Sequence, residues 1–229
     1  LAMQRMGNLE HVDRVKAGVQ ALVTFEYMGQ DIQTVDIDCG EFENIIKRGR
    51  IEGHKTDDKS EPLENAVFGL FRKDCKVFSE SNAIMTAVSD EKGYFEFGNI
   101  PYGEYVVREI KAPRGYILSN KSYPVSISED GEVIEITAEN KPITVEISKR
   151  DIYGNELKGA KMQIIDSEEN IVDEWTSDGT DHIVTELPAG DYTLKEIAAP
   201  DGYVIANDIR FTVDVYGNVT VENVDSTAV

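Results

Sequence analysis

The feature that most constrains this chain is an internal repeat. The stretch YVVREIKAPRGY, residues 105–116, returns as YTLKEIAAPDGY at residues 192–203. A shift of 87 residues aligns residues 99–120 with 186–207, and 10 of the 22 aligned positions are identical. Because a repeated sequence specifies a repeated structural unit, the chain is predicted to contain two copies of one fold.

The repeats occupy most of the chain, with the first placed at residues 50–141 and the second at residues 142–229. Upstream of Phe71 the copies align at a shift of 94 residues, so the first repeat carries seven extra residues between Phe71 and Asn99. Insertions of this kind fall in loops. The N-terminal segment, residues 1–49, contains strand-like pieces such as GVQALVTFEY but leaves its fold open. One interpretation is that it supplies the last strands of a preceding module.

Both repeats consist of short alternating stretches separated by turn residues, without a helical period. Antiparallel strands with one buried face, in units of about this length, predict an all-β chain of tandem β-sandwiches, immunoglobulin-like or prealbumin-like. The N-terminal segment is expected to be mostly β as well. The closing stretch of each repeat is expected to form a hairpin, which in the first repeat turns at Asp130-Gly131.

Composition narrows the possible partners. The chain has a formal net charge of -20, which argues against nucleic acid or an anionic membrane surface. No apolar run approaches the roughly 18 to 20 residues that span a bilayer, so we expect no membrane insertion. The cysteines, Cys39 and Cys75, match no metal spacing, and both free thiols and a disulfide remain open.

The chain shows no pattern typical of a turnover enzyme. The three histidines are scattered and match no metal spacing. There is also no nucleophile elbow and no phosphate-binding loop. We therefore expect no cofactor, no metal and no multiple-turnover reaction.

Polar side chains nevertheless recur on the inward face of the predicted strands. Alternate residues of a strand point to the same side, so Glu109 shares a face with Tyr105 and Val107. The other polar residues in phase with apolar neighbours are Glu196 with Tyr192 and Leu194, Lys55 with Ile51 and Gly53, Lys149 with Val145 and Ile147, Asn140 with Ile136 and Ala138, and Asn223 with Val219 and Val221. Each repeat thus places a lysine, a glutamate and an asparagine toward the core.

Such a set of side chains can react with itself. Burial lowers the pKa of a lysine and raises that of a glutamate, which favours a neutral amine beside a protonated or proton-sharing carboxyl. A neutral amine is a nucleophile, and the carboxamide carbon of asparagine is an electrophile when a neighbouring acid shuttles protons. Attack with loss of ammonia would join the two side chains by an amide in a single turnover.

The residues then carry a resemblance to a known family. Lysine in the first strand (HKTD, SKRD), the element E-x-x-A-P-x-G-Y, and asparagine in the last strand (AEN, VEN) resemble the Cna protein B-type, or SpaA-like, domains of Gram-positive surface adhesins and pilins. The resemblance covers residues 50 to 225. It implies a prealbumin-like sandwich with spontaneous isopeptide bonds, joining Lys55 to Asn140 with help from Glu109, and Lys149 to Asn223 with help from Glu196.

The second closing strand departs from the first. Nine residues separate Gly131 from Asn140, but only six separate Gly217 from Asn223. Asp225 lies in the same phase as Asn223 and is the alternative acceptor, with loss of water in place of ammonia.

The expected function is a structural stalk or pilin-type module on the cell wall, outside the cell. Other pilin subunits or host extracellular matrix are the partners that the resemblance implies. The alternative is a ligand-binding adhesin region, in which loops such as CKVFSESNAIM in the first repeat would contact a host protein or glycan.

Overall fold

A computed structural model describes residues 14–24 and 34–222. The chain separates into two compact units. One unit combines the residues through Arg50 with Gly98–Glu104 and Ser126–Ile134, and the other contains Ile51–Phe97, Tyr105–Val125 and the residues from Glu135 onward. Within the described residues, no helix has the length and apolar character needed to cross a membrane.

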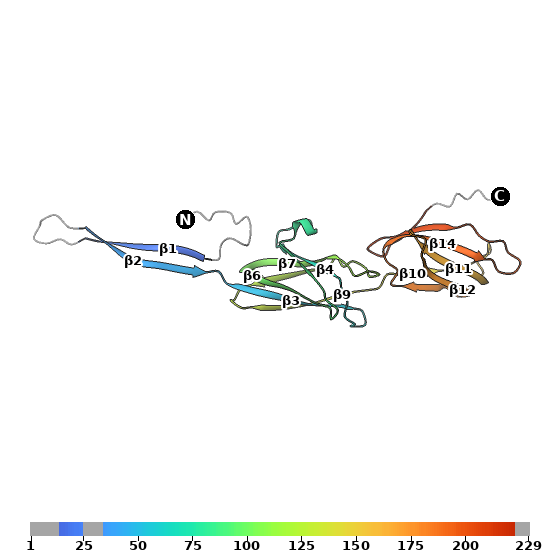
Figure 1. The fold of residues 1–229 in the computed structure, drawn as a ribbon, viewed down its shortest axis with the longest axis horizontal. Helices are drawn as coiled ribbons and strands as arrows, with labels where there is room; N and C mark the ends of the chain where they lie inside the picture. The colour runs from blue at the N-terminus through green and yellow to red at the C-terminus, as the bar shows by residue number, and fades with distance from the viewer. Residues whose placement is uncertain (1–13, 25–33, 223–229) are drawn as a thin grey trace, which may run out of the picture. The chain divides into compact units, whose positions relative to one another are not determined.

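The N-terminal segment contains a long antiparallel pair of strands (Figure 1). β1 (Arg14–Thr24) pairs with β2 (Thr34–Ile45), and Thr24 lies opposite Thr34. The register shifts once between Gly18 and Gln20, as at a β-bulge. The expectation of a mostly β N-terminal segment is confirmed.

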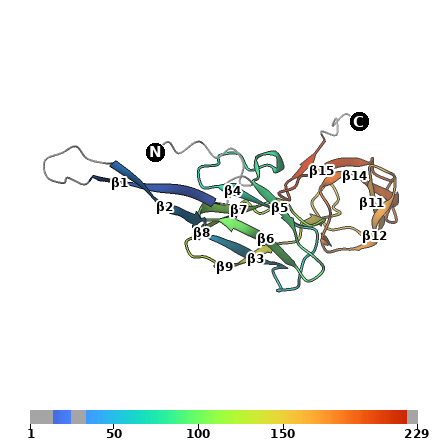
Figure 2. The same ribbon diagram turned by 60° about the vertical axis from the view of Figure 1, so that its left-hand side comes forward.

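The first repeat is a sandwich of two sheets. Its strands are β3 (Arg48–Asp57), β4 (Val67–Arg72), β5 (Met85–Val88), β6 (Tyr94–Pro101), β7 (Gly103–Lys111), β8 (Ser122–Ile127) and β9 (Val133–Asn140). One sheet has the order β6-β3-β9 and the other β5-β4-β7-β8 (Figure 2). Phe68 of β4 stacks on Phe95 of β6 with ring centroids 3.9 Å apart, so the two sheets meet through a packed aromatic layer.

Gly53 shows why this layer needs a residue without a side chain on β3. A Cβ at Gly53 would lie 2.1 Å from the Phe95 ring, closer than atoms can approach. The glycine therefore keeps the inward phase of β3 while it leaves room for the phenylalanine.

The second repeat is also all-β. Its strands are β10 (Thr144–Ile147), β11 (Lys158–Asp166), β12 (Ile171–Asp178), β13 (His182–Thr185), β14 (Gly190–Ala198), β15 (Ile209–Val213) and β16 (Val219–Val221). One sheet has the order β12-β11-β14-β15-β16, and β10 pairs with β13 in a second sheet. The buried core cluster contains Ile143, Val145, Ile164, Val184, Leu187, Tyr192, Phe211 and Val213. The predicted tandem β-sandwich class is confirmed.

The extra residues of the first repeat lie in the connection between β4 and β5. This connection spans residues 73–84 and contains a short 3-10 helix, η1 (Glu80–Asn82), whereas the equivalent connection from β11 to β12 spans only residues 167–170. Phe78 packs on Phe71 edge to face, with ring centroids 5.0 Å apart. The insertion is thus a folded surface loop.

The prediction that a hairpin closes the first repeat is wrong. β8 belongs to the sheet of β7, whereas β9 lies beside β3 in the other sheet, so the chain changes sheets between them. Gly131, with φ of 77°, does lie in the turn. By crossing over, β9 buries Ile136 and Ala138 in the core and places the last strand of the repeat next to the first.

The second repeat closes with the expected hairpin of β15 and β16, but two of its residues are not buried as predicted. Val219 and Val221 pair with Val213 and Phe211 and therefore share their inward face. Both valines remain exposed, because β16 is a three-residue strand at the end of its sheet.

Candidate functional site

The lysine of the first cluster is carried by β3. Burial alternates along this strand, so Ile51, Gly53 and Lys55 face inward while His54 is exposed. Lys55 is fully buried, with 0% of its surface accessible. Its Nζ donates a hydrogen bond to the backbone oxygen of Thr56 at 2.8 Å. The predicted inward phase of β3 is correct.

The glutamate comes from β7 in the facing sheet. Tyr105, Val107 and Glu109 are its buried residues, and Glu109 is 4% exposed. Its Oε2 accepts a hydrogen bond from the backbone N–H of Ser119 at 2.8 Å. This contact was not predicted, because a backbone donor leaves no signal in the type of side chain at its position.

The asparagine ends β9, the strand that lies beside β3. Asn140 is 3% exposed, and its Nδ2 donates to both carboxylate oxygens of Glu109, at 2.8 Å and 3.0 Å. Its Oδ1 is buried without a hydrogen-bond partner. The structure therefore gathers Lys55, Glu109 and Asn140 in the core, as the strand phases predicted.

Burial changes the acid–base chemistry of the first cluster. Loss of solvent lowers the pKa of Lys55 to about 8, although attraction to Glu109, Glu139 and Asp57 opposes the shift. Loss of solvent also raises the pKa of Glu109, against the opposing effects of the Ser119 hydrogen bond, the Lys55 charge and the Asn140 hydrogen bond. Both shifts favour the neutral forms of the two groups.

The second cluster has an equivalent lysine and glutamate, but its lysine is more exposed to solvent. Lys149 lies two residues beyond β10, and its side chain is 21% exposed. Its Nζ is 3.3 Å from Oε1 of Glu196, an ion pair whose geometry does not make a hydrogen bond. Oε2 of the buried Glu196 accepts the N–H of Ala206 at 2.6 Å, which matches the Ser119 contact in the first repeat.

The acceptor of the second cluster is not placed. Asn223 and the alternative Asp225 both lie outside the described residues. β16, which leads toward them, pairs with β15 rather than with β10. In the described part of the second repeat, the last strand therefore does not lie beside the first.

Metal ligation finds no support among the residues that the structure describes, since no group of three His, Cys, Asp or Glu side chains there could hold an ion. Cys75 is a free thiol and donates to the oxygen of Val77 at 3.2 Å, whereas Cys39 lies where side chains are not described. His182 contacts Asp173 at 2.7 Å and stacks on Trp175.

Comparison with known proteins found the SpaA prealbumin-like fold domain twice, at residues 49–142 and 143–227. A collagen adhesin of Staphylococcus aureus is 29% identical over 112 residues, which is 48% of this chain and 9% of that protein. The trypsin-resistant surface T6 protein of Streptococcus pyogenes serotype M6 is 28% identical over 130 residues, or 54% of this chain and 23% of that protein. The chain thus spans less than a quarter of the length of either relative.

Among solved structures, the Bacillus anthracis TIE protein gives a TM-score of 0.47 at 26% identity, over 90% of this chain and 40% of that one. The major pilin subunit BcpA of Bacillus cereus gives 0.39 at 14% identity, over 73% of this chain and 96% of that one. Since the matched residues make up most of the sequence, the chain belongs to the family of SpaA prealbumin-like fold domains and carries two of them in tandem.

Proposed function

We propose that this chain is a load-bearing stalk or pilin-type module of a cell-wall-anchored surface protein, with domains at residues 50–141 and 142–229. Each domain is closed by an amide bond that it forms within itself. The observation that carries the proposal is the buried contact of the Asn140 amide with both oxygens of Glu109, beside a lysine with a lowered pKa. The family and the named surface relatives support an extracellular location.

The reaction begins with the lysine amine. With a pKa of about 8, about one Lys55 in ten is neutral at pH 7, which is enough to supply a nucleophile. Its Nζ attacks Cγ of Asn140, and the Oδ1 that lacks a partner takes up the negative charge. The protonated Glu109, which contacts Asn140 through Nδ2 in the structure, must shift toward Oδ1 to give that oxygen its hydrogen as the charge develops.

Collapse of the intermediate completes the bond. Glu109, now a carboxylate, accepts a proton from Nζ and passes it to the Asn140 nitrogen, which it already contacts. It then takes back the hydrogen from Oδ1 as the carbonyl re-forms. The Cγ–Nδ2 bond breaks, ammonia leaves, and an Nζ–Cγ amide remains. Glu109 ends in its starting protonation state, so it acts as an acid–base catalyst for one turnover.

The bond would join the first and last strands of the repeat, which are neighbours in one sheet although they lie far apart in the sequence. β3 is the first strand and β9 the last, and they are adjacent in one sheet. The N–H of Arg50 donates to the oxygen of Glu132 at 2.9 Å, so the two strands also begin side by side. Force applied through the chain would pass across the amide without extending the 84 residues between Lys55 and Asn140.

The second repeat would use Lys149 and Asn223, with Glu196 as the shuttle. Support comes from the matching position of Glu196, from its backbone contact with Ala206 and from its ion pair with Lys149. Asp225 is the alternative acceptor. The shorter closing segment must bring its acceptor to Lys149 before the bond can form.

Single-molecule force extension tests the load-bearing role. The wild-type first repeat is expected not to extend between Lys55 and Asn140, whereas a Glu109→Gln variant should release roughly 300 Å of chain when it unfolds. Glu64→Gln, an exposed glutamate in the same repeat, is the matched control and should behave as wild type. Release of the full length by the wild-type repeat would overturn the proposal.

Ligand binding is the second candidate, and one observation bears on it. The loop at residues 73–84 exposes Val77 and is held in a defined shape by the Asn82 side chain, which donates to the Val77 oxygen at 3.0 Å. A solid-phase assay against extracellular matrix proteins and glycans separates the two functions. A stalk should bind none of them, and saturable binding lost in a Val77→Asp variant would assign a recognition role.

A further inference from the structure

The Pro-x-Gly-Tyr corner, residues 113–118 in the first repeat and 200–205 in the second, has the same conformation in both. Gly115 and Gly202 have φ of 85° and 87°, a region that favours glycine. The tyrosine N–H donates to the proline oxygen at 3.1 Å in each corner. Both corners are therefore preformed, and any difference between them lies in what covers them.

The corner of the first repeat is covered by the second repeat and the connection that leads to it. The N–H groups of Ile117 and Leu118 donate to the oxygens of Lys141 and Val215, at 2.9 Å and 2.8 Å. The Gly115 oxygen accepts the N–H of Ile143 at 2.8 Å. Ile117 also packs against the hydrophobic core of the second repeat. This corner is a joint between the repeats.

Close approach of the backbones defines the joint further. A Cβ at Gly115 would lie 2.4 Å from the backbone oxygen of Glu186. On the receiving side, Gly217 leaves space for Ile117, whose nearest side-chain atom would be 3.3 Å from a Cβ there. The receiving surface of the second repeat thus consists of Ile143, Glu186, Val215 and Gly217.

The corner of the second repeat is not covered by any residue that the structure describes. Tyr203, Val204 and Ile205 align with Tyr116, Ile117 and Leu118, and they are 50%, 90% and 58% exposed. Among the described residues, no atom lies within 4 Å of a Cβ built at Gly202. Three consecutive apolar side chains on this exposed, preformed corner form a contact surface that the described residues leave without a partner.

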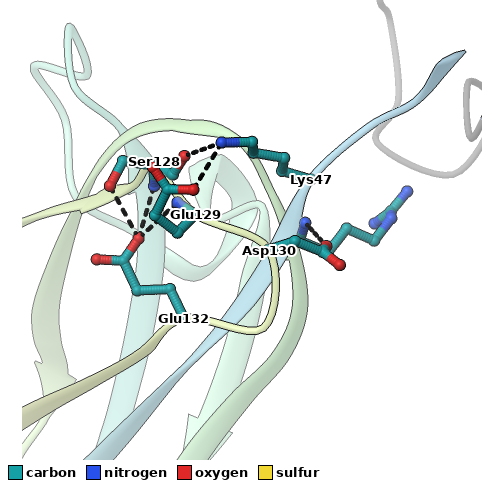
Figure 3. A network of polar contacts seen from close by, with 6 residues as sticks. Lys47, Ser128, Glu129, Asp130 and Glu132 are labelled. Atoms are coloured by element: carbon teal, nitrogen blue, oxygen red, sulfur yellow. Dashed lines mark hydrogen bonds and ion pairs between the residues drawn. The ribbon is translucent and has the colours of Figure 1, made fainter.

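Neither repeat of this chain offers a receiving surface on which the corner of the second repeat could dock. That of the second repeat holds the first corner. The equivalent end of the first repeat is charged, because Lys47 contacts the Ser128 oxygen and Glu129, at 3.1 Å and 2.8 Å (Figure 3). Glu132 accepts hydrogen bonds from Ser128 and Glu129 there.

The first repeat also lacks the apolar residue that the receiving surface of the second repeat presents to the corner. Gly49 stands where the second repeat has Ile143, and Asp130 accepts the N–H of Arg48 beside it, at 3.0 Å (Figure 3). An apolar corner would have to bury these charges, which is unfavourable. The occupant must therefore be a repeat that, like the second, carries apolar residues at the positions of Ile143 and Val215.

We propose that Tyr203, Val204 and Ile205 form the docking surface for a further prealbumin-like repeat, joined in tandem to the second and bearing the equivalents of Ile143, Glu186, Val215 and Gly217. A tandem partner is favoured over a separate molecule because the first joint also uses the connecting segment, through Lys141 and a bridge between Tyr116 and Pro142. The proposal does not depend on the amide cross-links.

Hydrogen exchange in a three-repeat chain tests this joint. The chain consists of residues 1–223 followed by a second copy of residues 141–229, so that the connection after Asn223 repeats the one after Asn140. The amide of Ile205 is expected to exchange at least about tenfold more slowly than in the 229-residue protein, because the equivalent N–H of Leu118 is hydrogen-bonded to the Val215 oxygen. Val204→Asp should restore fast exchange, whereas Ile183→Asp, at another exposed apolar position, should not.

Two results would overturn the proposal. One is an Ile205 amide that exchanges equally fast in both chains while the duplicated core peptides show a single protected population, which proves the added repeat folded. The other is a melting temperature that falls by several degrees in the 229-residue Val204→Asp variant. Such a fall would show that the corner belongs to the core of its own repeat, whereas an unchanged melting temperature supports a docking surface.

Discussion

The two repeats share a lysine and a glutamate but place the last strand differently. In the first repeat β9 lies beside β3, and Lys55, Glu109 and Asn140 are enclosed together. In the second, β16 extends the sheet at β15, while β10 pairs with β13. The motif alone therefore positions the acid and the amine, and the closing segment decides whether an acceptor reaches them.

Solvent access follows the same division. Lys55 is fully buried, which favours the neutral amine, whereas the Lys149 side chain is 21% exposed and lies 3.3 Å from Glu196. The first cluster thus holds an acid and an amine that burial shifts toward their neutral forms, and the second holds an ion pair.

The largest difference is expected when the first cross-link is prevented. Glu109→Gln should lower the free energy of unfolding of the first repeat by about 4 to 5 kcal/mol, the effect of closing a loop of this length. Lys55→Met, which prevents the bond without leaving a buried charge, is the control and should lose a similar amount. Urea unfolding measures both, and wild-type stability in the two variants would contradict the account.

A pH series isolates the buried lysine. In Asn140→Ala the amine cannot react, so Lys55 keeps a folded-state pKa of about 8 against an ordinary value of 10.5. Between these values the unfolded chain holds a proton that the folded chain has released. Stability should therefore rise with pH from about 8 to 10.5, by roughly 3 kcal/mol, while below pH 8 the full penalty remains.

The control for this series is the double variant Lys55→Met/Asn140→Ala, which lacks the titrating group. Its unfolding free energy, measured in urea at the same pH values, should lack this rise. Equal slopes in the two proteins would mean that Lys55 does not titrate in this range.

A smaller loss of stability is expected at a buried serine that each repeat carries outside the lysine–glutamate clusters. The buried Ser89 Oγ accepts the Ala66 N–H at 3.0 Å and donates to the Leu63 oxygen at 2.8 Å. The equivalent Ser177 Oγ accepts the Ala160 N–H at 3.0 Å. Ser89→Ala should cost about 2 kcal/mol and Ser177→Ala about 1 kcal/mol, since each leaves a buried N–H unpaired and the first also frees a carbonyl.

Thermal unfolding of the two serine variants checks this order. The exposed Ser126→Ala serves as the control in the first repeat and should leave stability unchanged. A larger loss of stability in Ser177→Ala than in Ser89→Ala would show that the two serines do not have equivalent roles in the two repeats.

Much of the fold followed from period-2 alternation, because a strand that buries every second residue reveals its inward face in the sequence. Lys55, Glu109 and Asn140 were predicted in this way, and all three are buried. Strand pairing was harder to predict, since β8 and β9 have alternating patterns whether they form a hairpin or join different sheets. The roles of the Ser119 N–H and of the corner contacts depend on backbone positions, which side-chain patterns do not encode.

The central claim is that these repeats join their own side chains, and the intact mass of the folded protein tests it most directly. The account predicts a mass below the sequence mass by two molecules of ammonia, or by one ammonia and one water if Asp225 is the second acceptor. In Glu109→Ala and in Glu196→Ala one cross-link is prevented, so each variant should show the loss of only one molecule. After refolding, the bond of the first repeat should form before that of the second. A wild-type mass equal to the sequence mass would contradict the claim.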